Sequence, residues 1–175
     1  MLHLFYKPYH IPFEYPFKTA HGSKTHQEGL LVQLSFGKFQ GWGEATYIPY
    51  YPNTSIEHMT QLLEEKRNLI EQYALIDPQR FWHFLNHLIP GNDFLISALD
   101  VAGWDLFSKM KQAPLHKLIG LQWKNIRPSC YTIGIQDNLN IKDIIQAHPA
   151  SIYKVKIGSF DDIKHIKDIK SATNA

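Results

Sequence analysis

The sequence predicts an α+β domain over roughly residues 1–125, followed by the opening of an α/β domain. Three observations lead to this fold class. Residues 1–45 contain runs with the alternation and composition of β-strands. Residues 54–120 carry apolar side chains at helical spacing. Residues 130–174 then alternate strand, helix, strand and helix, and a crossover of that length implies that the two strands pair in parallel.

The first domain is expected to begin with three strands, at 1–9, 29–36 and 38–45. The tight junction at Gly37 between the last two predicts a hairpin. Two segments with many Pro, Gly and polar residues, 11–28 and 46–53, are expected to be loops. The aromatic residues cluster at 5–17 and 36–51, where they could form a core or line a small-molecule pocket.

Helices are expected next. Thr54 and Glu57 have the spacing of a capping box. Asp77 followed by Pro78 predicts the start of a second helix, because aspartate caps helices and proline suits their first turn. The run 92–112 is apolar around much of its circumference and should be buried centrally, with a short turn closed by Gly120 after it. The apolar stripe of the first helix comprises Ile56, Met59, Leu62, Leu63, Leu69, Ile70 and Tyr73.

The second domain is expected to contain strands at 130–135 and 152–158 and helices around 141–147 and over 161–174. The last helix places Ile163, Ile166 and Ile169 on one side. Two parallel strands leave an open sheet edge, which is an aggregation liability. We therefore expect the chain to be a fragment, or another chain to complete its sheet.

Composition excludes several classes of protein. The net charge of +2 and the lack of a basic cluster argue against a nucleic-acid partner. No apolar run is long enough to span a membrane, and the N-terminus lacks the pattern of a signal peptide. The single cysteine, Cys130, excludes an internal disulfide and suits a reducing compartment. A soluble cytoplasmic protein is the expectation.

Lys154 and Lys156 lie two residues apart in "YKVKIG", so both side chains project from one face of the predicted strand. One interpretation places that face in water, where lysines are usual. The other places it inside a barrel, because parallel sheets are covered by helices or closed into barrels. A desolvated lysine beside a second cation has a lowered pKa and can act as a general base. The strand pattern alone leaves both interpretations open.

Other candidate residues carry weaker signals. His83 and His87 share a helix face but lack the glutamate of a zinc-protease helix, which favours a surface pair. "GWGEA" is not a phosphate loop, because no helix follows it. Glu44 could act in acid–base chemistry, although a strand-end carboxylate is more often structural. Cys130 has no cationic sequence neighbour and is expected to be a buried structural cysteine.

Taken together, several segments resemble the enolase superfamily, specifically its muconate-lactonizing subgroup and, within it, the dipeptide epimerases. "FKTAHGSKTHQEGLLVQL" is similar to the first capping loop and the strand after it, and "GWGEATYIPYYPNTSIE" to the second capping loop. "ISALDVAGWDLFSKMKQAPLHKLIG" resembles the helix that joins the capping domain to the barrel. "SCYTIGI" and "YKVKIG" resemble the first two barrel strands, the second with a Lys-x-Lys signature.

The resemblance implies a capping domain over 1–125 and the first two β/α units of a (β/α)₈ barrel over 126–175. It implies that a base removes the proton α to the carboxylate of a small-molecule dipeptide, with Mg²⁺ stabilising the enolate. Lys156 would be the general acid/base, and Lys154 would lower its pKa and help hold the carboxylate. The implied substrate contacts are Thr132, Phe17, Thr19 and Tyr51. A homo-oligomer is the expected assembly.

The resemblance also implies what this chain lacks. The family takes its metal carboxylates and its second lysine from later strands, so Mg²⁺ ligands are expected beyond Ala175 and the chain alone is expected to be inactive. Ala-Glu epimerases place an arginine two positions after the "TA" of the first capping loop, where this chain has Gly22, with Lys24 as the nearest downstream cation. An uncharged second residue of the dipeptide is therefore plausible. Alternatives are a cycloisomerase, an o-succinylbenzoate synthase, an N-acylamino acid racemase, or a non-catalytic binding or assembly module if the protein ends at Ala175.

Overall fold

The computed structural model describes residues 1–19, 22–135, 140–158 and 162–175. The chain forms two compact units. The first contains Met1–Ile11 and Gln27–Trp123, and the second contains Pro12–His26 and Lys124–Ala175. The expected division between residues 125 and 126 stays a prediction.

A three-stranded sheet of order β1-β2-β3 is formed by β1 (His3–Thr19), β2 (Gly22–Phe36) and β3 (Phe39–Thr46). β2 and β3 pair antiparallel, from Gly29 opposite Thr46 to Phe36 opposite Phe39. The turn between them begins at Gly37, whose φ of 57° lies in the left-handed region that favours glycine. The predicted hairpin is confirmed.

The expectation that 11–28 is a loop is wrong, because β1 and β2 continue as strands through most of this segment. The prolines that suggested a loop, Pro12 and Pro16, lie in β1, as does Pro8 before them, and β1 is an edge strand. An edge strand tolerates proline where its missing N–H would face away from the sheet. The spacing of four residues gives all three prolines the same side of the strand.

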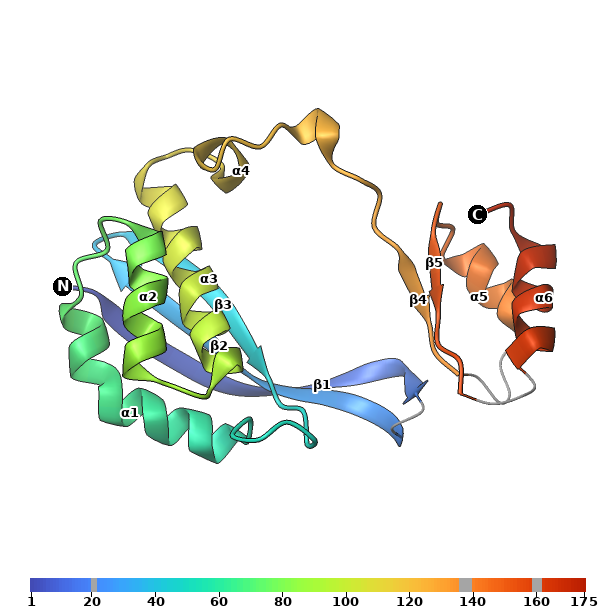
Figure 1. The fold of residues 1–175 in the computed structure, drawn as a ribbon, viewed down its shortest axis with the longest axis horizontal. Helices are drawn as coiled ribbons and strands as arrows, with labels where there is room; N and C mark the ends of the chain where they lie inside the picture. Colours follow the sequence, from blue (N-terminus) through green and yellow to red (C-terminus); the bar gives the residue numbers. More distant parts are fainter. Residues whose placement is uncertain (20–21, 136–139, 159–161) are drawn as a thin grey trace. The chain divides into compact units, whose positions relative to one another are not determined.

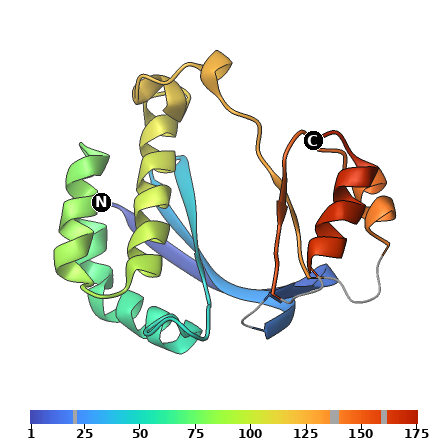
Figure 2. The same ribbon diagram turned by 45° about the vertical axis from the view of Figure 1, so that its right-hand side comes forward.

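Three helices cover one face of this sheet in the first unit: α1 (Ile56–Gln72), α2 (Pro78–Leu88) and α3 (Asp93–Met110) (Figures 1 and 2). As predicted, α3 is the central helix and packs against β3. The predicted start of α2 is confirmed, with the Asp77 side chain accepting from the Gln79 N–H and Pro78 in the first turn. Fully buried side chains of this core include Leu30, Val32 and Leu34 of β2, Leu63 of α1, Phe81 of α2 and Leu99 of α3.

The N-cap of the first helix lies one residue later than predicted. Ser55 is the N-cap, and its hydroxyl accepts from the His58 N–H at 3.2 Å. Thr54 is buried instead, and its hydroxyl donates to the carbonyls of Ile48 and Tyr51, which closes the loop after β3. Leu69, which the apolar stripe included, is 51% exposed.

The last helix of the first unit is α4 (Leu115–Leu118), and the short 3₁₀ helix η1 (Trp123–Asn125) begins at the last residue of this unit. Gly120 follows α4 with a φ of 76°, as the predicted helix stop requires. Within the described ranges, no helix combines the length and the apolar character needed to cross a membrane.

The second unit contains β4 (Tyr131–Ile133), α5 (Ile141–Ala147), β5 (Tyr153–Val155) and α6 (Asp162–Ala172). β4 and β5 pair in parallel, as predicted, although both strands are shorter than expected. The expected apolar side of the last helix is only partly buried, since Ile163 and Ile166 are 66% and 44% exposed. A small core consists of Ile133, Ile141, Ile145 and Ile169.

Candidate active site

The lysine face lies on β5 and just beyond its end. Lys154 is opposite Thr132 in the parallel register, and the Lys156 N–H donates to the Ile133 carbonyl at 2.9 Å. Tyr153 and Val155 pack against the core that α5 and α6 cover (Figure 1). Because side chains alternate along a strand, Lys154 and Lys156 project from the opposite face. Thr132 shares this face, since Tyr131 and Ile133 beside it contact the core.

Exposure differs along this face. Lys154 is exposed, whereas Thr132 and Lys156 are half-buried. A closed barrel interior would bury both lysines, but in the described part of this unit the sheet of β4 and β5 has two strands. The structure therefore places the two lysines and Thr132 together without desolvating Lys154.

The end of the β1–β2 hairpin packs against the end of β4. The Ile135 N–H donates to the Lys18 carbonyl at 3.0 Å. A side chain at Gly134 would lie 3.4 Å from that carbonyl and 3.4 Å from the Phe17 ring. The two segments thus lie within van der Waals distance of each other at Gly134. Gly134 is a position that the sequence analysis did not single out.

A pocket of about 390 Å³ lies between this hairpin and β4, lined by residues 13–17 and 131–134 together with Ile144 of α5. Its walls include the rings of Phe13 and Phe17, whose centroids are 6.3 Å apart. Thr132 and Phe17, both expected substrate contacts, line this pocket. Of the two alternatives left open for the aromatic residues of 5–17, Phe13, Tyr15 and Phe17 follow the second and line a pocket.

One carboxylate, Glu14, lies beside tyrosines of this pocket. A hydrogen bond to Glu14 raises the pKa of Tyr15. Burial raises the pKa of Tyr131, with smaller contributions from Glu14 and Tyr153. These shifts keep both phenols neutral and able to donate hydrogen bonds over a wider pH range.

The remaining predicted contacts are more scattered. The Thr19 hydroxyl donates to the Gly22 carbonyl at 3.4 Å, and Lys24 is half-buried on β2. Ala20 of the predicted capping loop lies outside the described residues. Tyr51 belongs to the first unit, where its ring contacts Tyr50 and Phe94 with centroids 5.4 and 5.3 Å apart.

Metal ligands were expected beyond Ala175. Among the described residues of 124–175, no three His, Cys, Asp or Glu side chains bring ligand atoms close enough together to hold an ion. The expectation that the Mg²⁺ ligands lie beyond Ala175 stays a prediction.

Two of the weaker candidates have structural roles. In "GWGEA", a side chain at Gly41 or Gly43 would collide with the backbone of α3, so the glycines allow close helix–sheet packing. Glu44 accepts a hydrogen bond from the Tyr9 hydroxyl, whose pKa is raised by burial and by Glu44.

The other two candidates differ in outcome. His83 and His87 are exposed on α2, and His87 Nδ1 lies 2.7 Å from the His83 carbonyl, as expected of a surface pair. The expectation of a buried cysteine is wrong, because Cys130 is exposed. Cys130 precedes β4 and lies outside the isoleucine core of its unit.

The first unit has a three-stranded antiparallel sheet covered by helices, and the second has consecutive β/α segments with paired lysines on one strand. This combination defines the capping domain and first barrel segments of an enolase-superfamily protein. Residues 3–120 match the family model described as "Mandelate racemase / muconate lactonizing enzyme, N-terminal domain". The chain belongs to this family.

Similar proteins include epimerases and a synthase. The chain is 33% identical over 172 residues to the L-Ala-D/L-amino acid epimerase of Flavobacterium johnsoniae, covering 98% of this chain and 51% of the relative. It is 25% identical to the o-succinylbenzoate synthase of Listeria innocua, covering 93% and 45% of the two chains. It thus spans about half the length of the curated relatives it matches.

A solved structure supports the fold. The dipeptide epimerase of Enterococcus faecalis complexed with Mg and the dipeptide L-Leu-L-Tyr has a TM-score of 0.83 and 19% identity, covering 98% of this chain and 50% of that one.

Proposed function

We propose that this chain is the N-terminal part of a Mg²⁺-dependent dipeptide epimerase, which exchanges the proton α to the carboxylate of an L-Ala-L-amino acid dipeptide. The observation that carries the proposal is the shared face of Thr132, Lys154 and Lys156 on the parallel pair β4–β5. The epimerases among the relatives support it. In the complete protein, Mg²⁺ would stabilise negative charge on the substrate carboxylate, held by residues outside this chain.

Within this proposal, Lys156 is the acid/base on one face of the substrate, where it takes the α-proton of one epimer, and Lys154 is the neighbouring cation. The group that adds a proton to the opposite face would lie outside this chain. Lys154 would place a second positive charge on the face where Lys156 acts as the base. Lys154 also attracts the negative charge that develops on the substrate carboxylate. Thr132 and Phe17 are proposed to contact the dipeptide, with Thr19, Tyr51 and Lys24 as further candidates.

The second residue of the dipeptide is proposed to be uncharged. The position where Ala-Glu epimerases carry an arginine is Gly22, which offers no cation for a glutamate side chain. The pocket between the hairpin and β4 is mostly aromatic and apolar, with Glu14 as its acidic group. Both features favour an apolar side chain over an acidic one.

The test is deuterium exchange at the α-carbon of L-Ala-L-Ala, L-Ala-L-Phe and L-Ala-L-Glu, followed by NMR in D₂O with the complete protein and Mg²⁺. Lys156→Ala should lower the exchange rate by about 10²-fold or more, the usual contribution of a general base. Lys142→Ala, which removes an exposed lysine of α5, is the matched control and should leave the rate unchanged. Formation of the opposite epimer by Lys156→Ala at the natural rate would refute the role of Lys156, because inversion needs a base on each face of the substrate.

A second candidate is o-succinylbenzoate synthase, which the Listeria relative favours. Formation of o-succinylbenzoate by the complete protein, without exchange on any dipeptide, would replace the epimerase proposal. Self-association of the complete protein stays a prediction, checked by its mass in solution.

A further inference from the structure

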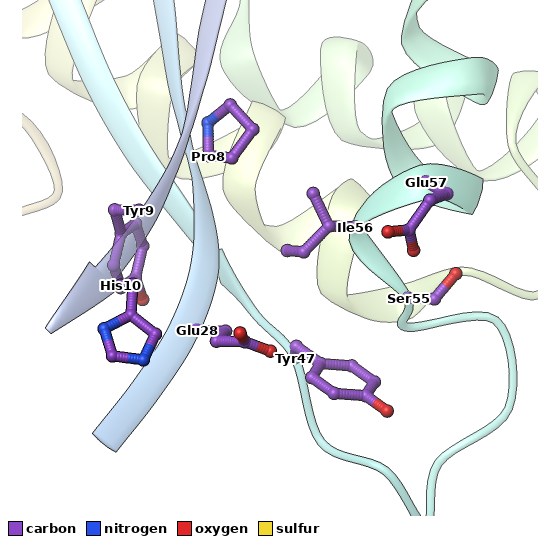
Figure 3. Close-up of a pocket in the computed structure, with 8 residues that line it drawn as sticks. All are labelled: Pro8, Tyr9, His10, Glu28, Tyr47, Ser55, Ile56 and Glu57. Carbon is purple, nitrogen blue, oxygen red and sulfur yellow. The ribbon is translucent and has the colours of Figure 1, made fainter.

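A second pocket, of about 560 Å³, lies entirely within the first unit (Figure 3). It is bordered by β1 at Pro8, by β2 at Glu28, by Tyr47 after β3 and by the start of α1 at Ile56 and Glu57. Its volume falls in the range of small-molecule sites, roughly 300–1,000 Å³. It contains none of the residues proposed to act in epimerisation, so it can be considered independently of that function.

The charged groups of the pocket are acidic. Glu28 and Glu57 lie on opposite sides, and their carboxylates turn toward the space between them (Figure 3). A ring nitrogen of His10 lies within 4.8 Å of a Glu28 carboxylate oxygen at one end of the pocket. None of the described residues that line the pocket is a lysine or an arginine. A ligand with positive charge would therefore match it.

The walls are held in place without a ligand. The Gln27 side chain donates to the carbonyls of Glu28 and Tyr47 at 2.6 and 3.0 Å, and the Tyr47 N–H donates to the Glu28 carbonyl at 2.9 Å. On the other side, the Ser55 cap bonds the His58 N–H and fixes the first turn of α1, which carries Glu57. Pre-organised walls reduce the ordering cost of binding.

We propose that this pocket binds a small organic cation, specifically an aliphatic diamine. One ammonium group would donate to Glu28 and His10, and the other to Glu57, since an ammonium group has three N–H donors and forms strong hydrogen bonds with carboxylates. The hydrocarbon chain between them would lie against Ile56 and Pro8. A bare metal ion held by Glu28 and His10 would leave the Glu57 side of the cavity unused.

Isothermal titration calorimetry of the complete protein with 1,4-diaminobutane tests this proposal. We expect one binding site per chain, and weaker binding of n-butylamine by about 10-fold or more because one charged contact is lost. Glu28→Gln and Glu57→Gln should each weaken diamine binding by a similar factor. The matched control is Glu65→Gln, an exposed glutamate of α1 outside the pocket, which should leave the affinity unchanged.

Several results would overturn the proposal. The diamine could fail to bind, or n-butylamine could bind equally well. Glu65→Gln could weaken binding as much as Glu57→Gln, which would indicate general charge attraction. The diamine could fail to bind while Zn²⁺ binds, with an affinity that Glu28→Gln lowers and Glu57→Gln does not. That result would make the pocket a metal site. Circular dichroism of each variant ensures that folded proteins are compared.

Discussion

Asp100 of α3 is a residue that the surrounding packing leaves unsatisfied. Its Oδ1 atom is buried and has no hydrogen-bond partner among the described residues. Burial raises the pKa of the Asp100 carboxyl above its ordinary value. The folded state therefore holds this proton more tightly than the unfolded state. The free energy of unfolding should fall as pH rises from the ordinary aspartate pKa of about 4 through the raised value, and should then stay lower.

Asp100→Asn removes the charge and keeps the shape of the side chain. We expect the variant to be more stable than the natural chain at pH 7, with the gain shrinking toward pH 4 as Asp100 becomes protonated. Urea unfolding at several pH values measures this difference. Asp93→Asn, at an exposed position of the same helix, is the control. A gain that is the same at pH 4 and pH 7 would contradict the explanation.

At the scale of elements, the contact between β3 and α3 depends on two glycines. A Cβ at Gly41 would lie 2.1 Å from the Ala102 carbonyl oxygen, and one at Gly43 would lie 1.9 Å from that of Ala98. Both atoms belong to helix backbone, which cannot turn aside as a side chain can. The helix can therefore lie directly on the strand only where these side chains are missing.

Gly43→Ala should destabilise the first unit by about 1–3 kcal/mol or more, because the helix must move away from the sheet and its packing loosens. Thermal or urea unfolding measures the change. Gln40→Ala, at an exposed position on the same strand, should change the stability by less than about 0.5 kcal/mol. Equal effects of the two substitutions would show that strand propensity, and not helix contact, determines the result.

Side chains of α1 and α3 also form hydrogen bonds with backbone groups of the two edge strands, β1 and β3. On β3, Asp105 of α3 accepts from the Trp42 N–H at 2.9 Å, and Lys109 donates to the Gln40 carbonyl at 2.8 Å. On β1, the Leu4 N–H donates to the Glu71 carboxylate, and the Leu4 carbonyl accepts from Arg67. Both of these side chains belong to α1. Edge groups bonded in this way are less available for pairing with another chain.

At the scale of the whole molecule, the two units differ in the size of their cores. The first buries side chains from β1, β2 and β3 and from α1, α2 and α3 in one cluster. The second has a core of four buried isoleucines between two three-residue strands and two helices. Because apolar burial is the main stabilising contribution, the second unit should open more readily.

Hydrogen–deuterium exchange of the 175-residue chain, followed by mass spectrometry, checks this expectation. Peptides covering 30–34 of β2 should exchange about 10-fold or more slowly than peptides covering 131–133 and 153–155. Exchange in β4 and β5 as slow as in β2 would show that the small core is as stable as the large one.

Local patterns in the sequence were sufficient for much of the fold and for part of the candidate site. The Asp77-Pro78 helix start and the Gly37 turn depend on backbone groups within a few residues, so adjacent side chains decide them. Alternation along a strand likewise places Lys154 and Lys156 on one face, whatever lies opposite. The family resemblance, which rests on the order of several such segments, is confirmed by the match over 3–120.

Tertiary structure decided what depends on partners distant in the sequence. The prolines of residues 11–28 suggest a loop, but β1 is an edge strand. Proline lacks the backbone N–H, and on the outer side of an edge strand the sheet has no acceptor for it. Ser55 became the cap because the Thr54 hydroxyl bonds carbonyls of the preceding loop. Glu28 and Glu57 lie 29 positions apart in the sequence, and only the packing of α1 beside the sheet brings them to one pocket. Short-range hydrogen bonds and side-chain alternation can be read from neighbouring residues, whereas burial and pocket formation depend on which distant segments pack together.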